Sequence, residues 1–243
     1  MPDALFHFYP DLNDFLSRHR RSGIFTETFQ TGQSLKHLIE AAGVPHTEIG
    51  RVRAGSQTVD LDYQVQDGDQ IAVYPPGPGA GQPEAGSRFV LDSHLGKLAG
   101  WLRILGFDSL YRNDFDDMRL AEISAGQDRI LLTRDRRLLM RKMVRYGHCL
   151  RSLDSLVQVR EVLTRYNLFD KINAFRRCLH CNGLLEPVRK AEVLDRLEPL
   201  TRRYYDLFHH CPNCGQIYWK GSHYEHMLET IATFYPDGMQ PKT

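Results

Sequence analysis

The sequence predicts an α/β fold in which a parallel sheet flanked by helices lies between two smaller units. Three observations support this prediction. A Gly- and Pro-rich stretch at residues 74–87 separates the first segment from the rest of the chain. From Ser87 onward, short apolar runs alternate with helical patterns, which is typical of a parallel sheet covered by helices. Near the C-terminus, two Cys-x-x-Cys pairs indicate a small metal-bound unit.

Length and composition fit a protein of two or three small folded domains. The chain has 243 residues, of which 42% are hydrophobic, enough to bury several cores. No apolar run approaches the roughly 20 residues of a membrane helix, and the start of the chain does not resemble a signal peptide. We therefore expect a cytoplasmic protein with no membrane-spanning segment.

The charge of the chain is distributed unevenly. Residues 1–87 carry 6 Lys and Arg against 11 Asp and Glu, a net charge of −5. Residues 88–166 carry 15 against 10, a net charge of +5. An acidic first third and a basic middle indicate different roles, and the basic part is the candidate for binding a polyanion.

The first segment has the order of elements of a small α+β domain. Alternating apolar residues predict strands at 4–9 and 24–29, and a turn leads into a further strand within 67–75. Between them, residues 34–43 follow a helical spacing that ends at Gly43. This order is compatible with a β-grasp fold. The His residues of the segment are isolated, so we predict no catalytic site in it.

The middle segment repeats a strand followed by a helix. Gly106 closes the first helix, whose apolar face begins at Leu95. Strands are predicted at 87–92, 107–112, 128–133 and 148–153, and helices at 95–105, 117–126, 136–144 and 156–166. We expect a parallel sheet with helices on its faces.

Four of the five cysteines form two knuckles separated by 29 residues, namely Cys178, Cys181, Cys211 and Cys214. Two-residue spacing lets both thiolates of a pair reach one ion. Disulfides are disfavoured without a secretory signal, and a redox pair would not need a matching second copy. We therefore predict a structural zinc site, because four thiolates leave no open position for a substrate. We interpret Cys149 as a buried small apolar residue.

An aromatic pair beside a lysine, Tyr218-Trp219-Lys220, follows the second knuckle. Such residues could stack a nucleic-acid base. They also form the small core of many zinc-bound modules, and we favour this second interpretation.

Three acids occupy equivalent places in the strand and helix pattern. Asp92 ends the first strand, Asp117 stands at the start of the second helix, and Asp135 follows the third strand. Each could simply cap a helix. However, the carboxyl ends of parallel strands share one edge of the sheet, where ligands bind. The possible substitutes for the second acid are Asp114, Asp116 and Glu122, and Asp154 is a weaker fourth candidate.

Carboxylates gathered at one edge repel one another unless a cation joins them. Oxygen ligands favour Mg²⁺ or Mn²⁺, which can activate water and stabilise charge on a phosphoryl oxygen. Basic residues around such a pocket would hold the flanking phosphates of a nucleic acid. The candidates for this role are Lys97, Arg103, Arg134, Arg136, Arg137 and Arg141.

Several motifs, in order, resemble the Mut-seven-type C-terminal RNase domain, a PIN-like nuclease fold with a zinc ribbon. They are FVLDSHLGKLAGWLRILGFDSLYRND, DD-x-x-L, RILLTRDRRLL, the paired Cys-x-x-Cys knuckles and YWKGSH, and they span about residues 88–227. The resemblance implies a metal-dependent RNase site, which carries over to Asp92, Asp117 and Asp135.

The first segment resembles the ubiquitin-like β-grasp domain of sulfur carriers, through GVPHTEIG and DGDQIAVYP. A sulfur carrier needs a free C-terminal Gly-Gly carboxylate, whereas GPGAG is internal here. We therefore expect this domain to dock a protein partner or to regulate the rest of the chain.

These observations divide the chain into five parts: a ubiquitin-like domain (1–82), a linker (83–87), a PIN-like nuclease domain (88–170), a zinc ribbon (171–230) and a tail (231–243). The predicted function is hydrolysis of RNA by a metal-dependent ribonuclease. The alternative is an RNA- or ribosome-binding adaptor whose PIN-like fold does no chemistry. A third interpretation is a scaffold that recruits protein partners through the β-grasp domain.

Overall fold

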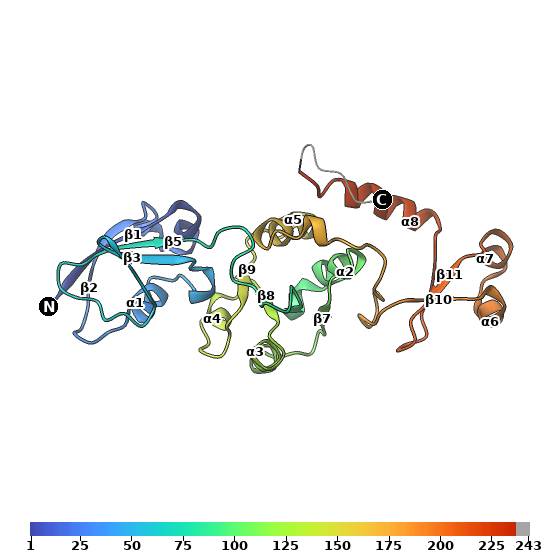
Figure 1. Ribbon diagram of the computed structural model, residues 1–243, viewed down its shortest axis with the longest axis horizontal. Helices are drawn as coiled ribbons and strands as arrows, with labels where there is room; N and C mark the ends of the chain where they lie inside the picture. The colour runs from blue at the N-terminus through green and yellow to red at the C-terminus, as the bar shows by residue number, and fades with distance from the viewer. Residues whose placement is uncertain (237–243) are drawn as a thin grey trace.

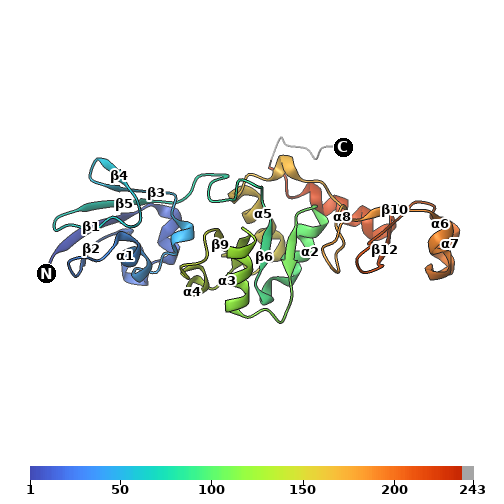
Figure 2. The same cartoon turned by 60° about the horizontal axis from the view of Figure 1, so that its bottom comes forward.

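The computed structural model describes residues 1–236, which form three units in a row along the chain (Figure 1). A five-stranded sheet with one helix comes first, a four-stranded parallel sheet covered by helices comes second, and a small three-stranded sheet comes last. The same order is visible after rotation of the view (Figure 2). The predicted α/β fold class is confirmed. Within residues 1–236, no helix is both long enough and apolar enough to cross a lipid bilayer.

The first unit is a mixed sheet with the strand order β2-β1-β5-β3-β4. The first strand, β1, is antiparallel to β2 and parallel to β5. The helix α1 (Leu35–Ala41) begins after Ser34, whose side chain accepts a hydrogen bond from the His37 N–H. A parallel pair of first and last strands with one helix is the predicted β-grasp arrangement. The strands are β1 (Asp3–Phe8), β2 (Ile24–Thr28), β3 (Arg51–Ala54), β4 (Gln57–Val59) and β5 (Gln70–Tyr74), and short 3-10 helices lie at η1 (Pro10–Phe15), η2 (Arg18–Arg20) and η3 (His46–Glu48).

The second unit is the predicted parallel sheet, with the strand order β7-β6-β8-β9. Successive residues of its strands are buried on opposite faces: Phe89 and Leu132 contribute to one core, whereas Val90 and Leu131 contribute to the other. The strands are β6 (Phe89–Leu91), β7 (Ser109–Tyr111), β8 (Ile130–Thr133) and β9 (Gly147–Cys149). The helices are α2 (Gly96–Ile104), α3 (Asp117–Gly126), α4 (Arg136–Leu139) and α5 (Ser155–Arg165), with 3-10 helices at η4 (Ser93–Leu95) and η5 (Phe169–Lys171).

The helix predicted at 136–144 is shorter than expected, because it ends at Leu139. The following residues turn toward the first unit. Val144 is fully buried there, and its carbonyl oxygen lies 2.7 Å from Nε2 of His46. This tertiary contact draws the chain out of the helical path that the apolar spacing predicts.

The third unit holds the cysteine knuckles. Its strands are antiparallel and enclose a small core of Val193, Leu197, Phe208 and Ile217. The elements are β10 (Glu186–Val188), α6 (Lys190–Val193), η6 (Leu194–Arg196), α7 (Pro199–Tyr204), β11 (Phe208–His210) and β12 (Ile217–Trp219).

The last helix, α8 (Ser222–Ala232), returns from the third unit to the second (Figure 1). Ile231 and Phe234 are buried in the same core as α2 and α5. The predicted tail, 231–243, therefore begins with residues that pack on the parallel sheet of the second unit, and its residues 237–243 lie outside the described part of the chain.

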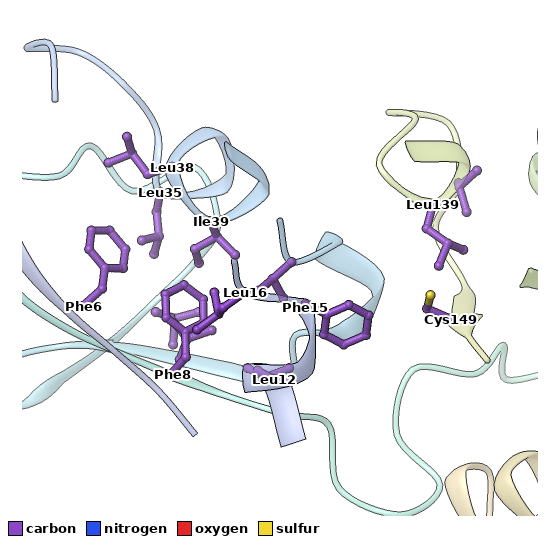
Figure 3. Packing of buried hydrophobic residues seen from close by; sticks show 14 of the residues in the cluster. Phe6, Phe8, Leu12, Phe15, Leu16, Leu35, Leu38, Ile39, Leu139 and Cys149 are labelled. Carbon is purple, nitrogen blue, oxygen red and sulfur yellow. The ribbon is translucent and has the colours of Figure 1, made fainter. Parts of the chain in front are cut away.

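A single apolar core joins the first unit to the second. It runs from Phe6 and Ile39 of the first unit through Phe15 to Leu139 and Cys149 of the second (Figure 3). The stretch between the two units also has fixed contacts, since the Gly79 N–H donates to the Arg165 carbonyl oxygen at 2.9 Å. The proposed domain boundaries remain predictions, but the first two units pack as one body.

Candidate active site and metal centre

Two of the three predicted acids lie at the edge of the parallel sheet where the strand order reverses. The chain passes from β6 to β7 on one side and then crosses to β8 on the other side of β6. In such sheets the ligand crevice lies outside the carboxyl ends of the strands at this switch point. Asp92 is the first residue after β6, and Asp135 is the second residue after β8. Because the two strands are parallel, both acids belong to this edge.

Asp92 is buried at this edge, with an exposed fraction of 8%. Its Oδ2 accepts a hydrogen bond from the Thr133 hydroxyl at 2.6 Å, and its Oδ1 lies 3.3 Å from Nδ1 of His94. Its side chain makes no capping bond to the following turn, so the capping interpretation does not apply to Asp92. In the described part of the chain, no Lys or Arg forms an ion pair with this carboxylate.

Thr133 connects the two acids. Its hydroxyl donates to Asp92 and accepts a hydrogen bond from the Asp135 N–H at 2.9 Å. Asp135 itself is exposed and caps α4, because its Oδ1 accepts from the Arg137 N–H at 2.8 Å. Neither Thr133 nor His94 was among the residues predicted from the sequence. Their signal was their position, beside Asp135 and beside Asp92 respectively.

Asp117 is the first residue of α3, the helix that follows β7. Asp116 is the cap of α3 and accepts from the Arg119 N–H at 2.7 Å. The Asp117 side chain is 53% exposed, and its Oδ2 lies 3.8 Å from the Arg141 guanidinium. The substitute Asp114 forms a bidentate contact with Arg112 instead.

The structure does not gather the three carboxylates into one cluster. Among residues 1–236, the four cysteines are the only group of three or more His, Cys, Asp or Glu residues whose ligand atoms all lie within 4.8 Å of one another. Asp92 and Asp135 are linked through Thr133, whereas Asp117 is held by Arg141.

The four cysteine sulfurs fit one zinc ion. The Sγ atoms of Cys178 and Cys214 lie 3.5 Å apart, and those of Cys181 and Cys211 lie 3.4 Å apart. Tetrahedral bonds of about 2.3 Å separate neighbouring sulfurs by about 3.8 Å, so the observed spacing is close to that of a bound site. At Gly183 a Cβ atom would lie 2.7 Å from the Asn213 side-chain nitrogen and 3.0 Å from the Cys211 sulfur, so any larger residue would crowd this knuckle.

Tyr218 belongs to the cysteine knuckle. Its hydroxyl lies 3.1 Å from the Cys178 sulfur and accepts a hydrogen bond from the Leu179 N–H. Burial raises the pKa of Cys178, but hydrogen bonds from the Tyr218 hydroxyl and the Cys181 amide outweigh burial and lower the pKa to about 6. The neighbouring Trp219 is 40% exposed, and its ring lies beside that of Phe208. Neither Tyr218 nor Trp219 is part of the buried apolar core of the module.

Comparison with known protein families identifies the family of the chain. The model of the Mut7-C RNAse domain matches residues 87–231, and that of the Mut7-C ubiquitin domain matches residues 1–77. The chain belongs to the Mut7-C RNAse domain family. No curated protein and no solved structure matches the chain. The match to the Mut7-C RNAse domain includes both the acidic edge and the cysteine knuckles.

Arg103 of the Mut7-C domain does not have the predicted role. We expected it to hold an RNA phosphate, but it is buried, with an exposed fraction of 5%. Its guanidinium donates to the carbonyl oxygens of Ser109, Leu179 and His180. Because helix α2 buries this face, the side chain joins the nuclease sheet to the first cysteine knuckle.

Asn182 makes a second connection between the knuckle and the nuclease sheet. Its amide accepts from the Ser109 N–H at 2.9 Å and donates to Asp108 at 2.8 Å. Asp108 also binds Arg129 at 2.7 Å. Burial raises the pKa of Asp108, but these hydrogen bonds outweigh it and hold the pKa below its usual value. The cysteine module is therefore fixed to the amino end of β7, away from the acidic edge.

Arg136 also differs from its predicted role. Its guanidinium donates to the carbonyl oxygens of Phe15 and Asp14 in the ubiquitin domain. The local sequence pattern does not indicate this docking, and a contact of Arg136 with RNA stays a prediction. The other predicted cations, Lys97, Arg134 and Arg137, are exposed, and Arg141 lies beside Asp117.

Proposed function

We propose that the chain is a metal-dependent ribonuclease that hydrolyses the phosphodiester bonds of RNA. The observation that supports this most directly is the Asp92 carboxylate, buried at the switch point without a Lys or Arg partner among the described residues. A buried carboxylate that faces only a hydroxyl and an imidazole keeps part of the cost of burying its charge, and a divalent ion would offset this cost. Membership of the Mut7-C RNAse domain family supports an RNA-related nuclease role.

Asp92 and Asp135 would hold a Mg²⁺ or Mn²⁺ ion through carboxylate oxygens. Asp117, the third predicted ligand, would have to leave its contact with Arg141 to join them. Such an ion, when bound, activates water and offsets charge on the phosphoryl group. Thr133 fixes the orientation of Asp92 before substrate binds. His94 lies against the other oxygen of Asp92 and limits its rotation.

Substrate binding would use the exposed cations around this edge. Lys97 and Arg137 lie at the start of the helical segments that follow β6 and β8. Lys and Arg side chains at such positions can pair with the phosphates on either side of the scissile bond.

We propose that the cysteine cluster binds a structural zinc ion. Its four sulfurs are within reach of one ion, and a four-thiolate site leaves no open position for substrate. Its hydrogen-bonded attachment to β7 gives the ion a role in holding the C-terminal module against the nuclease sheet.

The test of catalysis is cleavage of a fluorescent single-stranded RNA with Mn²⁺ or with EDTA. We expect EDTA to abolish cleavage, and Asp92→Asn and Asp135→Asn each to lower kcat by at least about a hundredfold, because loss of a direct ligand exceeds the roughly 10- to 100-fold effect of changing residues behind the ligands. Asp128→Asn is the matched control, because Asp128 precedes β8 at the opposite end of that strand. RNA cleavage that persists in both Asp92→Asn and Asp135→Asn would contradict the proposed active site.

One observation favours the alternative of a non-catalytic RNA- or ribosome-binding adaptor. The three carboxylates are not gathered around one point, since Asp117 is paired with Arg141. An adaptor would bind RNA in a salt-dependent manner without cleaving it. Its RNA affinity would fall in Arg137→Ala and remain unchanged in Asp92→Asn.

A protein partner is proposed for the ubiquitin domain. Its strand β2 lies at the edge of the sheet, and Ile24 on that strand is 53% exposed. Exposed edge strands bind extended peptides through main-chain hydrogen bonds. Loss of partners that cross-link to the full chain after Ile24→Lys would support this surface, and their retention would argue against it.

A further inference from the structure

The ubiquitin domain is docked at the carboxyl edge of the nuclease sheet, on the side of β9. Glu48 of this domain accepts a hydrogen bond from the Cys149 N–H at 2.6 Å and lies 3.0 Å from Nδ1 of His148. Nε2 of His148 lies 3.0 Å from Glu161. The shared apolar core and this buried contact fix one domain against the other.

Phe15 is the centre of a second contact between the two domains. Its ring faces Leu139 and Cys149 of the nuclease sheet (Figure 3). The guanidinium carbons of Arg136 and Arg151 each lie 5.2 Å from the ring centroid. Both guanidiniums also donate to backbone carbonyls of the ubiquitin domain. These two arginines are therefore held in fixed positions at the interface.

A pocket of about 280 Å³ opens beside this contact, and both domains line it. Its walls are Asp14, Phe15, Arg21, Arg134, Arg136, Cys149, Leu150 and Arg151. Four arginines and one acid, Asp14, thus line the pocket. Asp14 is largely exposed and lies 3.8 Å from Arg151, so it contributes a weak, solvent-screened ion pair.

The two remaining arginines of the pocket are available for a ligand. Arg21 is exposed on the ubiquitin domain, and Arg134 is exposed between β8 and Asp135. In the part of the chain that the structure describes, neither guanidinium forms a hydrogen bond or an ion pair. Guanidinium groups match the oxygens of a phosphate with paired hydrogen bonds.

The pocket lies on the same edge of the sheet as the proposed active site. Arg134 directly precedes Asp135 in sequence, and Leu150 follows β9, the strand next to β8. A phosphate in the pocket would therefore be near the acidic edge. An acidic peptide would also complement the positive charge, but the position beside Asp135 favours RNA.

We propose that this pocket binds a phosphate of the RNA substrate, so that the ubiquitin domain forms part of the substrate-binding surface. This inference rests on the proposed nuclease function, because it assigns a substrate phosphate to the same edge. Arg21 and Arg134 contact the phosphate directly, and Arg136 and Arg151 supply fixed positive charge behind it.

The test measures RNA binding without cleavage. Fluorescence anisotropy of a labelled 20-nucleotide single-stranded RNA in EDTA would be recorded for the full-length wild type, Arg21→Ala, Arg134→Ala and the double variant. Arg18→Ala is the matched control, since Arg18 is exposed on the same domain and does not line the pocket. Thermal melting of each variant checks that the fold is intact.

We expect each pocket substitution to weaken RNA binding about fivefold and Arg18→Ala to have little effect. If both arginines hold one phosphate, the double variant will weaken binding by less than the product of the single effects. The slope of log K against log salt will become shallower by about 0.7 for one lost phosphate contact on single-stranded RNA.

An unchanged affinity and salt slope in the double variant would overturn the inference. Inorganic phosphate could raise the Tm of the wild type but not of the double variant, while the two proteins bind RNA equally. This result would assign the pocket to free phosphate and would also overturn the inference. Competition by a poly-glutamate peptide alone would do the same in favour of a protein ligand. Failure of the nuclease proposal is recognised separately, as cleavage that persists in Asp92→Asn while the pocket variants bind RNA weakly.

Discussion

Glu48→Gln tests the buried contact that fixes the ubiquitin domain on the nuclease sheet. The Glu48 and His148 side chains are 3% and 4% exposed, and Glu161 lies on the other side of the imidazole. Glutamine keeps an oxygen that can accept from the Cys149 N–H but removes the charge that faces His148. The substitution therefore isolates the electrostatic part of the contact.

The size of the effect follows from the pKa of His148. Burial lowers this pKa, but the charges and hydrogen bonds of Glu48 and Glu161 outweigh burial and raise it from 6.5 to about 9. At about 1.4 kcal/mol for each pKa unit, the two carboxylates together stabilise the protonated folded state by about 3 kcal/mol. Because Glu161 remains in the variant, we expect Glu48→Gln to lower the free energy of unfolding by about 2 kcal/mol at pH 6.

The difference between wild type and variant should depend on pH in a defined direction. A raised pKa of His148 gives stabilisation that is complete below pH 6.5 and is lost as the pH rises through about 9. Burial raises the pKa of Glu48, but His148 and the Cys149 amide outweigh burial and lower it, so its contribution is lost only in acid, near and below pH 4.5. The advantage of the wild type is therefore largest between about pH 5 and 6.5.

Urea unfolding at pH 6 and pH 10 measures this difference, since other titrating groups are common to both proteins and largely cancel. We expect the penalty of Glu48→Gln to fall below about 1 kcal/mol at pH 10, where His148 is neutral. An equal penalty at the two pH values would refute the electrostatic origin of the contact. When His148→Gln is introduced into both the wild type and Glu48→Gln, the difference in unfolding free energy between the two proteins should no longer depend on pH.

Three further predictions concern the other fixed contacts. Cys178→Ser should lower the zinc content from one ion per chain toward zero and reduce the Tm, as metal analysis and calorimetry will show. Arg103→Met should destabilise the chain by about 2 kcal/mol in urea unfolding, because three carbonyl oxygens lose their donor. Thr133→Val should lower kcat about tenfold together with a modest fall in Tm, because it keeps the shape of the side chain but removes the hydrogen bond that orients Asp92; a lowered Tm with an unchanged kcat would instead indicate a purely structural role.

Much of the architecture could be predicted because it depends on local pattern. Alternating apolar residues indicated the strand that became β1, short apolar runs indicated β6 and β8, and the spacing of two Cys-x-x-Cys pairs indicated the four-cysteine cluster. The common edge of Asp92 and Asp135 also followed from the sequence, since parallel strands place their carboxyl ends together.

The contacts between domains could not be predicted in the same way. A basic residue such as Arg136 has the same local pattern whether it faces solvent or a carbonyl oxygen of another domain. Likewise, the apolar spacing of residues 136–144 indicates a buried helix, but not that Val144 is drawn away by His46. Local periodicity shows that a side chain is buried without showing what buries it.

The position of the ubiquitin domain has a consequence for how the nuclease edge works. Because Glu48 binds the backbone of β9 and Phe15 packs between two arginines of the Mut7-C domain, the domain is held on the strand beside the proposed active site. A tethered module with a flexible linker would contribute affinity only through its local concentration. A fixed module instead presents Arg21 in a set geometry relative to Arg134, which lowers the entropy cost of binding a phosphate between them. The fusion of the two domains is thereby expected to affect RNA affinity directly, even without any protein partner.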